Sequence, residues 1–181
     1  MVKVNFIISF VLSLILLLGI GVVFCEEREI DKVNGFRGLQ WGTQLPEDKF
    51  DYVRTEPSYG GVKIYKRKKE NMKVGIALVD SIEYGVWRDK FCHVLIMGKG
   101  DNDKFLQIRE AVFNKFGKRN RRDRHTERYV WSGKETWILL KYRPFLGDGV
   151  FYMASKKIKE QQKRDKESLV TTPTTNKEEG F

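Results

Sequence analysis

The feature that most constrains the fold is one strong amphipathic pattern, residues 102–117, set between two groups of strand-like segments. Within it, Phe105, Ile108, Val112 and Phe116 recur at spacings of three and four residues, so they form one stripe of a helix. A helix with one apolar stripe must bury it against another layer of structure. We therefore expect an α+β domain, in which an antiparallel sheet of several strands packs against this main helix.

The ends of this helix are marked by residues with known capping preferences. Asp101 or Asn102 is expected to cap its N-terminus, and Gly117 is expected to end it. A short helix is also expected from Pro46 to about Val53, because proline is favoured in a first helical turn.

The segments on either side of the helix are rich in apolar and β-branched residues and are bounded by turn residues. We expect strands at residues 36–41, 62–68, 72–79, 81–87 and 91–98 before the helix, and at 128–133, 136–142 and 150–155 after it. Turns are expected at Glu70-Asn71 and at Arg88 to Lys90. In the strand 91–98, simple alternation predicts that Cys92 shares a face with Val94 and Ile96, while His93 shares the other with Phe91, Leu95 and Met97.

The chain divides into three parts by composition. Residues 1–25 form an apolar N-terminal segment, and residues 34–160 are expected to form a single α+β domain. Residues 161–181 are charged and polar and are expected to be a disordered tail, with a charged helix or frayed extension from Lys156 to Glu167.

The N-terminal segment predicts export across the cytoplasmic membrane. Lys3 precedes an apolar run from Phe6 to Phe24, and Glu26 follows it closely, which is the order of a secretory signal. Three outcomes fit this pattern: cleavage after Cys25, lipidation of Cys25, or retention of the run as a membrane anchor. The bulky Phe24 argues against lipidation. Loss of Cys25 would leave Cys92 without an intramolecular disulfide partner, and we expect Cys92 to be a buried, inert thiol.

The charge balance predicts anionic partners. The chain carries 34 Lys and Arg against 24 Asp and Glu, a net charge of +10, and residues 1–25 contribute only Lys3 to it. An exported domain with this excess favours anionic lipid, an anionic envelope polymer or an acidic protein. Nucleic acid is not expected as a partner, because export removes the opportunity.

A basic segment is the strongest candidate for such a surface. Between Lys115 and Arg128 the chain has seven basic residues and two acidic ones. The residues assigned to anionic-surface binding are Lys118, Arg119, Arg121, Arg122, Arg124 and Arg128. Each such side chain near an anionic membrane contributes roughly 1 kcal/mol. The alternative interpretation is a solvated loop that keeps the domain soluble.

The residue types needed for catalysis or metal binding do not form a recognisable pattern. The only histidines are His93 and His125, no nucleophile motif is present, and the adjacent pair Cys92-His93 has no metal-ligand spacing. No catalytic residue, cofactor or metal is therefore assigned. The four tryptophans (Trp41, Trp87, Trp131 and Trp137) fall on expected strands or their ends, where packing is the usual role and a ligand platform the alternative.

Three stretches carry a resemblance to a known group of proteins. The start "GFRGLQWGT", the helix ending "VFNKFGK" and the pair "YVWSGKETWILLKY" and "VFYMASKK" resemble an uncharacterised family of small exported bacterial proteins. The resemblance covers roughly residues 34–160. It implies export and no established activity.

The favoured hypothesis is a non-enzymatic exported protein, periplasmic, secreted or membrane-anchored, that binds a protein partner or an anionic envelope surface. The alternative is a hydrolase acting on an envelope substrate through a site that no motif reveals. A chaperone-like or purely structural accessory domain is a third option.

Overall fold

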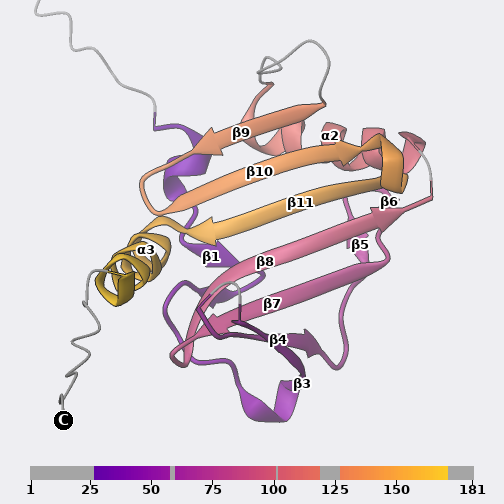
Figure 1. Ribbon diagram of the computed structural model, residues 1–181. Coiled ribbons are helices and arrows are strands. Elements are labelled where there is room, and N and C mark those ends of the chain that lie inside the picture. Colours follow the sequence, from indigo (N-terminus) through magenta and orange to yellow (C-terminus); the bar gives the residue numbers. More distant parts are fainter. Residues whose placement is uncertain (1–26, 58–59, 101, 119–126, 171–181) are drawn as a thin grey trace, which may run out of the picture.

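The computed structural model describes residues 27–57, 60–100, 102–118 and 127–170. It confirms the α+β class: seven strands form one antiparallel sheet, and two α-helices pack with it (Figure 1). The strands of the main sheet are β3 (Phe50–Glu56), β4 (Val62–Arg67), β7 (Ser81–Trp87), β8 (Lys90–Lys99), β9 (Arg128–Ser132), β10 (Thr136–Arg143) and β11 (Asp148–Ser155). The helices are α2 (Asn102–Phe116) and α3 (Lys156–Val170).

The sheet has the strand order β3-β4-β7-β8-β11-β10-β9. β7 and β8 form the expected hairpin, whose turn residues Arg88 and Asp89 both have positive φ, as a tight two-residue turn requires. The chain then enters α2, returns at the far edge as β9, and runs inward through β10 to β11, which pairs with β8. The helix thus connects the middle of the sheet to its edge.

Helix α2 covers one face of the sheet and buries the predicted stripe. Phe105, Ile108 and Val112 are almost fully buried, in one core with side chains from β7, β8, β9, β10 and β11. Gly117 has a φ of +81° and its N–H donates to the carbonyl of Phe113, so it ends the helix as expected. Trp131 is the largest fully buried side chain of this core and donates its indole N–H to the Gly117 carbonyl at 3.0 Å.

Two short hairpins lie on the same side as α2 and correct two sequence expectations. Residues 36–41 form not one strand but a hairpin of β1 (Gly35–Phe36) and β2 (Leu39–Gln40). Residues 72–79 likewise fold into β5 (Lys73–Val74) and β6 (Ala77–Leu78) instead of a strand of the main sheet. In the second case Gly75, with a φ of +61°, turns the chain in the middle of the apolar alternation, which leaves Ile76 and Leu78 exposed.

The short helix expected from Pro46 to about Val53 is also corrected. Only a 3-10 turn, η2 (Glu47–Lys49), forms there, and β3 begins at Phe50. Phe50 is buried against the ring of Tyr84, with ring centroids 5.0 Å apart, and β3 pairs along β4. Tertiary pairing with β4 therefore overrides the local helix signal.

A β-bulge reverses the expected faces of Phe91 and Cys92, while His93 keeps its expected face with Leu95 and Met97. The register between β7 and β8 shifts between Gly85 and Val86, so one extra residue of β8 is accommodated at this point. Phe91 stays on the α2 side with Val94 and Ile96, whereas Cys92 packs into a second cluster on the opposite side, with Val62, Ile64, Trp87 and Ile158. His93 also lies opposite Phe91, so their predicted common face is wrong. The Cys92 thiol is buried, as expected.

Helix α3 follows β11 without a loop. The Ser155 hydroxyl accepts the N–H of Ile158 at 3.3 Å, and the α3 residue Ile158 packs into the cluster with Cys92. The helix continues to Val170, past the expected start of the tail at residue 161, and residues 171–181 lie outside the described residues. Residues 1–25, which are expected to form a signal peptide or anchor, also lie outside them. Within the described part of the chain, neither α-helix combines the length and apolar character needed to cross a bilayer.

Candidate binding face on the open side of the sheet

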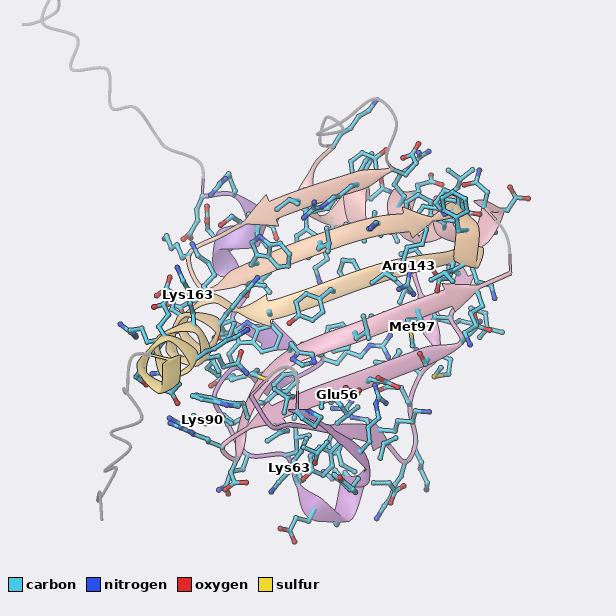
Figure 2. The ribbon with its side chains drawn as sticks, in the orientation of Figure 1. Glu56, Lys63, Lys90, Met97, Arg143 and Lys163 are labelled. Atoms are coloured by element: carbon cyan, nitrogen blue, oxygen red, sulfur yellow. The ribbon has the colours of Figure 1, made fainter. Side chains whose placement is uncertain are left out.

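The face of the sheet turned away from α2 is the candidate functional site. We call it the open face; it is formed by the outward-pointing side chains of β8, β11, β10 and β9, which are four neighbouring strands. Figure 2 looks onto this face, with Met97 on β8, Arg143 near the end of β10 and Lys163 on α3 labelled around it.

The strand register arranges the open face in cross-strand rows. In one row Val130, Leu139, Tyr152 and Leu95 lie side by side on β9, β10, β11 and β8, and Glu83 of β7 follows. In the next row Val150 and Met97 are paired. These six apolar side chains, Val130, Leu139, Tyr152, Leu95, Val150 and Met97, are all half-buried, and we call them the apolar patch. Together they cover the middle of the open face.

Such a patch is unusual for an exposed sheet face. Antiparallel sheets that face water on one side alternate apolar side chains inside with polar ones outside. Here β8, β10 and β11 carry apolar residues on both faces, as in "HVLIM", "WILL" and "VFYM". Monomeric soluble proteins rarely expose a contiguous apolar surface of this kind, and where they do it marks an interaction site.

Two bidentate ion pairs border the patch. On one side, Arg54 of β3 donates to both carboxylate oxygens of Glu83, at 3.0 and 2.8 Å. On the other, Arg143 of β10 binds Asp148 of β11, with its Nε 2.7 Å from a carboxylate oxygen. Glu83 and Asp148 are buried, and in each case the hydrogen bond to the acid raises the pKa of the arginine. In each pair the arginine and the carboxylate satisfy one another's hydrogen-bonding groups, and the apolar patch lies between the two pairs.

A third border carries two neighbouring positive charges. Arg128 of β9 and Lys141 of β10 are direct cross-strand partners, and like charges in that position repel. No carboxylate of the described residues forms an ion pair with either side chain. The Nε of Arg128 is shielded from solvent and has no hydrogen-bond acceptor in the described structure. This arrangement is unfavourable in the isolated domain and favours an anionic group placed over it.

Helix α3 forms a raised wall at one end of the open face. Figure 1 shows it nearly along its axis, in front of the strand ends where β11 finishes. Its Lys159 ammonium lies 4.0 Å from the centroid of the Trp137 ring, and its Asp165 is paired with Arg88 of the β7–β8 turn. The helix has six basic and three acidic residues, so this wall is also positively charged.

The pair Cys92-His93, at the edge of this face, has the properties of packed structure and not of a reactive dyad. Burial raises the pKa of the Cys92 thiol to about 12 and lowers the pKa of His93 to about 4, although the nearby Glu83 opposes the second shift. Both groups are therefore neutral near pH 7. The His93 ring lies over Gly85, where a Cβ would come within 2.1 Å of it.

The basic residues predicted to bind an anionic surface are only partly covered by the structure. Lys118 is exposed just after α2, and Arg128 is the half-buried first residue of β9, beside the apolar patch. Arg119, Arg121, Arg122 and Arg124 lie outside the described residues. Their proposed role stays a prediction.

The tryptophans divide between the two sides of the sheet and its ends. Trp41 donates its indole N–H to the Thr136 hydroxyl at 2.7 Å, and Trp87 donates to the Gly60 carbonyl at 3.1 Å. Together with the buried Trp131, these two therefore have packing roles. Trp137 lies on the open face, against Tyr152, with ring centroids 5.9 Å apart.

The described residues contain no group of three or more His, Cys, Asp or Glu side chains placed to hold a metal ion.

Sequence reasoning missed the apolar patch, because each strand was assigned one inward face. The signal was present in the continuous apolar runs of β8, β10 and β11, which predict a sheet covered on both faces.

Comparison with known proteins adds no relative. A scan against models of protein families gave no match, and searches of curated proteins and of solved structures found none similar to this chain. The resemblance to an uncharacterised family of exported bacterial proteins therefore stays a prediction.

Proposed function

We propose that this protein is a non-enzymatic binding domain whose open face docks a segment of a protein partner that carries both apolar and acidic side chains. The observation that carries the proposal is the apolar patch across four neighbouring strands, on the sheet face that α2 does not cover. Burial of that patch by a partner would complete a sheet whose strands are apolar on both sides.

The borders of the patch determine the chemistry of the partner. The Arg128–Lys141 pair and the basic helix α3 provide positive charge next to apolar surface. Carboxylates of a partner segment would relieve the repulsion between Arg128 and Lys141, while its apolar side chains would cover Leu139, Tyr152 and Leu95.

A protein segment suits this face better than a membrane surface does. The side chains of the patch are half-buried among their neighbours and do not protrude. Helix α3 stands out beside them, so a flat bilayer would meet the helix before it reached the patch (Figure 1). A polypeptide segment can lie along the strands next to the helix.

The location of this binding belongs to the same proposal. Residues 1–25 have the order of an export signal, so the domain would act on the outer side of the cytoplasmic membrane, either free or held by its N-terminus. The partner would then be an envelope or secreted protein. The net charge of the exported part favours an acidic one.

The test uses the methionine methyl groups as reporters. Met97 lies in the apolar patch, whereas Met153 is buried on the α2 side of the sheet. The protein purified from its producing cell, with carbon-13 in the methionine methyls, is titrated with a soluble peptide of alternating Leu and Glu and with its Leu-Lys counterpart. We expect the acidic peptide to shift the Met97 signal saturably and the basic peptide to leave it unchanged.

Matched charge reversals test the assignment to this face. Lys141→Glu should weaken the acidic peptide about fivefold or more, because it places an acid beside the bound segment. Lys49→Glu makes the same change in net charge at an exposed position of η2, outside the patch, and should have a much smaller effect. Equal losses in both variants, or a Met97 shift with phosphatidylglycerol vesicles and none with the peptide, would refute a protein-docking face.

A further inference from the structure

The side of the sheet opposite the open face holds a cavity of about 290 Å³ between α2 and the strands. Its floor is formed by Ile96 of β8 and by Phe151 and Met153 of β11. Ala111, Val112 and Phe116 of α2 form one wall. The other sides are lined by Gly35 and Phe36 of the β1–β2 hairpin, by Val74 of the β5–β6 hairpin and by Val33, which precedes β1. Ten of the twelve lining residues are apolar or glycine, and the remaining two, Arg37 and Lys115, are cations.

Backbone packing fixes the walls of this cavity. A Cβ on Gly35 would lie 1.9 Å from the carbonyl oxygen of Leu39, so the β1–β2 hairpin cannot carry a side chain there. A Cβ on Gly75 would lie 2.6 Å from the Cβ of Ala111, so the β5–β6 hairpin is pressed directly against α2. Because glycine stands at both close approaches, neither position has a flexible side chain that could move into the cavity and fill it.

Arg37 is held in place at the cavity. It is the first residue of the two-residue β1–β2 turn and has a φ of +48°, which an arginine rarely adopts. Its guanidinium pairs with the buried carboxylate of Glu70 and donates to the backbone carbonyls of Asn71 and Lys73. These contacts use three of the five guanidinium N–H donors and leave two for another acceptor.

Lys115 supplies the second cation, from the last turn of α2. Its ammonium lies 5.6 Å from the centroid of the Phe116 ring, next to the cavity wall. The pKa of Glu29 is lowered mainly by a hydrogen bond that its carboxylate accepts from Lys32 at 2.6 Å, and to a smaller extent by the charge of Lys115. Lys115 is therefore available to a bound anion.

From this combination we propose that the cavity binds one single-chain amphiphile with a carboxylate head, of the fatty-acid type. The chain would lie on Ile96, Phe151 and Met153, and the carboxylate would lie between Lys115 and the remaining donors of Arg37. The volume of about 290 Å³ lies just below the range of about 300–1,000 Å³ for small-molecule sites, which suits one short acyl chain. This site lies across the sheet from the open face and does not depend on the proposed function.

The test compares three probes that share one chain length: decanoate, decanol and decyltrimethylammonium. The methionine-labelled protein purified from its producing cell is titrated with each below its micelle concentration. We expect decanoate to bind saturably at one site and to shift Met153 but not Met97. Decanol should bind more weakly, and the cationic probe should not bind.

Two variants assign the site. Lys115→Gln should weaken decanoate about three- to tenfold and leave decanol unchanged, while Lys49→Gln, at an exposed lysine outside the cavity, should leave both unchanged. Val74→Phe should fill the cavity and abolish binding; Ile76→Phe, on the same hairpin but exposed, is its control. Circular dichroism establishes that each variant folds.

The outcomes that overturn the proposal are specific. Equal binding of all three probes would show a non-selective apolar cavity. A Met97 shift without a Met153 shift would place the amphiphile on the open face instead. Decanoate binding that survives Val74→Phe in a folded protein would also refute this cavity as the site.

Discussion

Lowering the pH from about 7 to about 5 should destabilise the domain through His93. The His93 ring is enclosed by Gly85 beneath it, Tyr152 beside it at a centroid distance of 5.2 Å, and the Cys92 sulfur 3.4 Å from its Nδ1. Burial lowers its pKa from 6.5 to about 4, so it stays neutral in the folded state at pH values where an unfolded chain would protonate it.

The direction and the size of the expected change in stability follow from the difference between the pKa of His93 in the folded state and its pKa in the unfolded state. Because the unfolded state binds the proton first, stability is fully present above pH 6.5 and is lost as the pH falls toward 4. For a shift from 6.5 to about 4, the loss at pH 5 is about 2 kcal/mol, and at still lower pH it approaches about 3 kcal/mol. Acids with lowered pKa values, such as Asp80 and Asp31, lose their contribution only at more acidic pH.

The assay is urea unfolding followed by tryptophan fluorescence at pH 7, 6 and 5. The free energy of unfolding of the native protein should fall by about 2 kcal/mol over this range. His93→Gln, which cannot protonate, should remove most of the dependence, whereas His125→Gln should keep it. A native protein whose stability is flat between pH 7 and pH 5, or a His93→Gln variant that keeps the full slope, would show that His93 is not held neutral by burial.

Three further predictions concern the same part of the sheet. Gly85→Ala should lower the free energy of unfolding in urea by about 1–3 kcal/mol, because the new Cβ would collide with the His93 ring; a Gly85→Ala variant as stable as the native protein would contradict this. Arg54→Met should lower the free energy of unfolding by about 2–3 kcal/mol, because it leaves the buried Glu83 carboxylate unpaired. Adding Glu83→Gln should restore much of that loss, and a double variant no more stable than Arg54→Met alone would contradict this. Alkylation of Cys92 by iodoacetamide at pH 8 should require unfolding, since burial keeps the thiol protonated, and rapid labelling in the absence of urea would disprove its inert role.

The parts of the fold that could be predicted are those coded by local periodicity. The α2 stripe of Phe105, Ile108 and Val112 repeats at helical spacing, so the helix, its end at Gly117 and its buried face were predicted correctly. The N-terminal cap expected at Asp101 or Asn102 stays a prediction, because Asp101 lies outside the described residues. The β7–β8 hairpin was also predicted, because the polar turn separates two strongly apolar strands. The order of strands, helix and strands then limited the domain to the α+β class.

The errors arose where long-range packing changed the local pattern. Alternation alone placed Cys92 with Val94, but the bulge opposite Gly85 and Val86 inserts one residue and turns Cys92 to the other side. The apolar alternation of residues 72–79 suggested a sheet strand, but Gly75 folds it into a hairpin against Ala111 of α2. Neither event can be read from spacing, because each depends on which segment becomes the neighbour.

The amino-acid sequence by itself determined the helix, most of the strands, the fold class and the positive charge, because periodicity and composition are properties of neighbouring residues. Tertiary structure alone decided that Leu95, Leu139, Tyr152 and Val130 form one apolar patch beside the Arg128–Lys141 pair. It alone also formed the half-open cavity between α2 and the sheet, with Arg37 and Lys115 at its border. The physical reason is that both sites combine residues far apart in the chain, and strand order and register, which are set by burying the common core, bring those residues together.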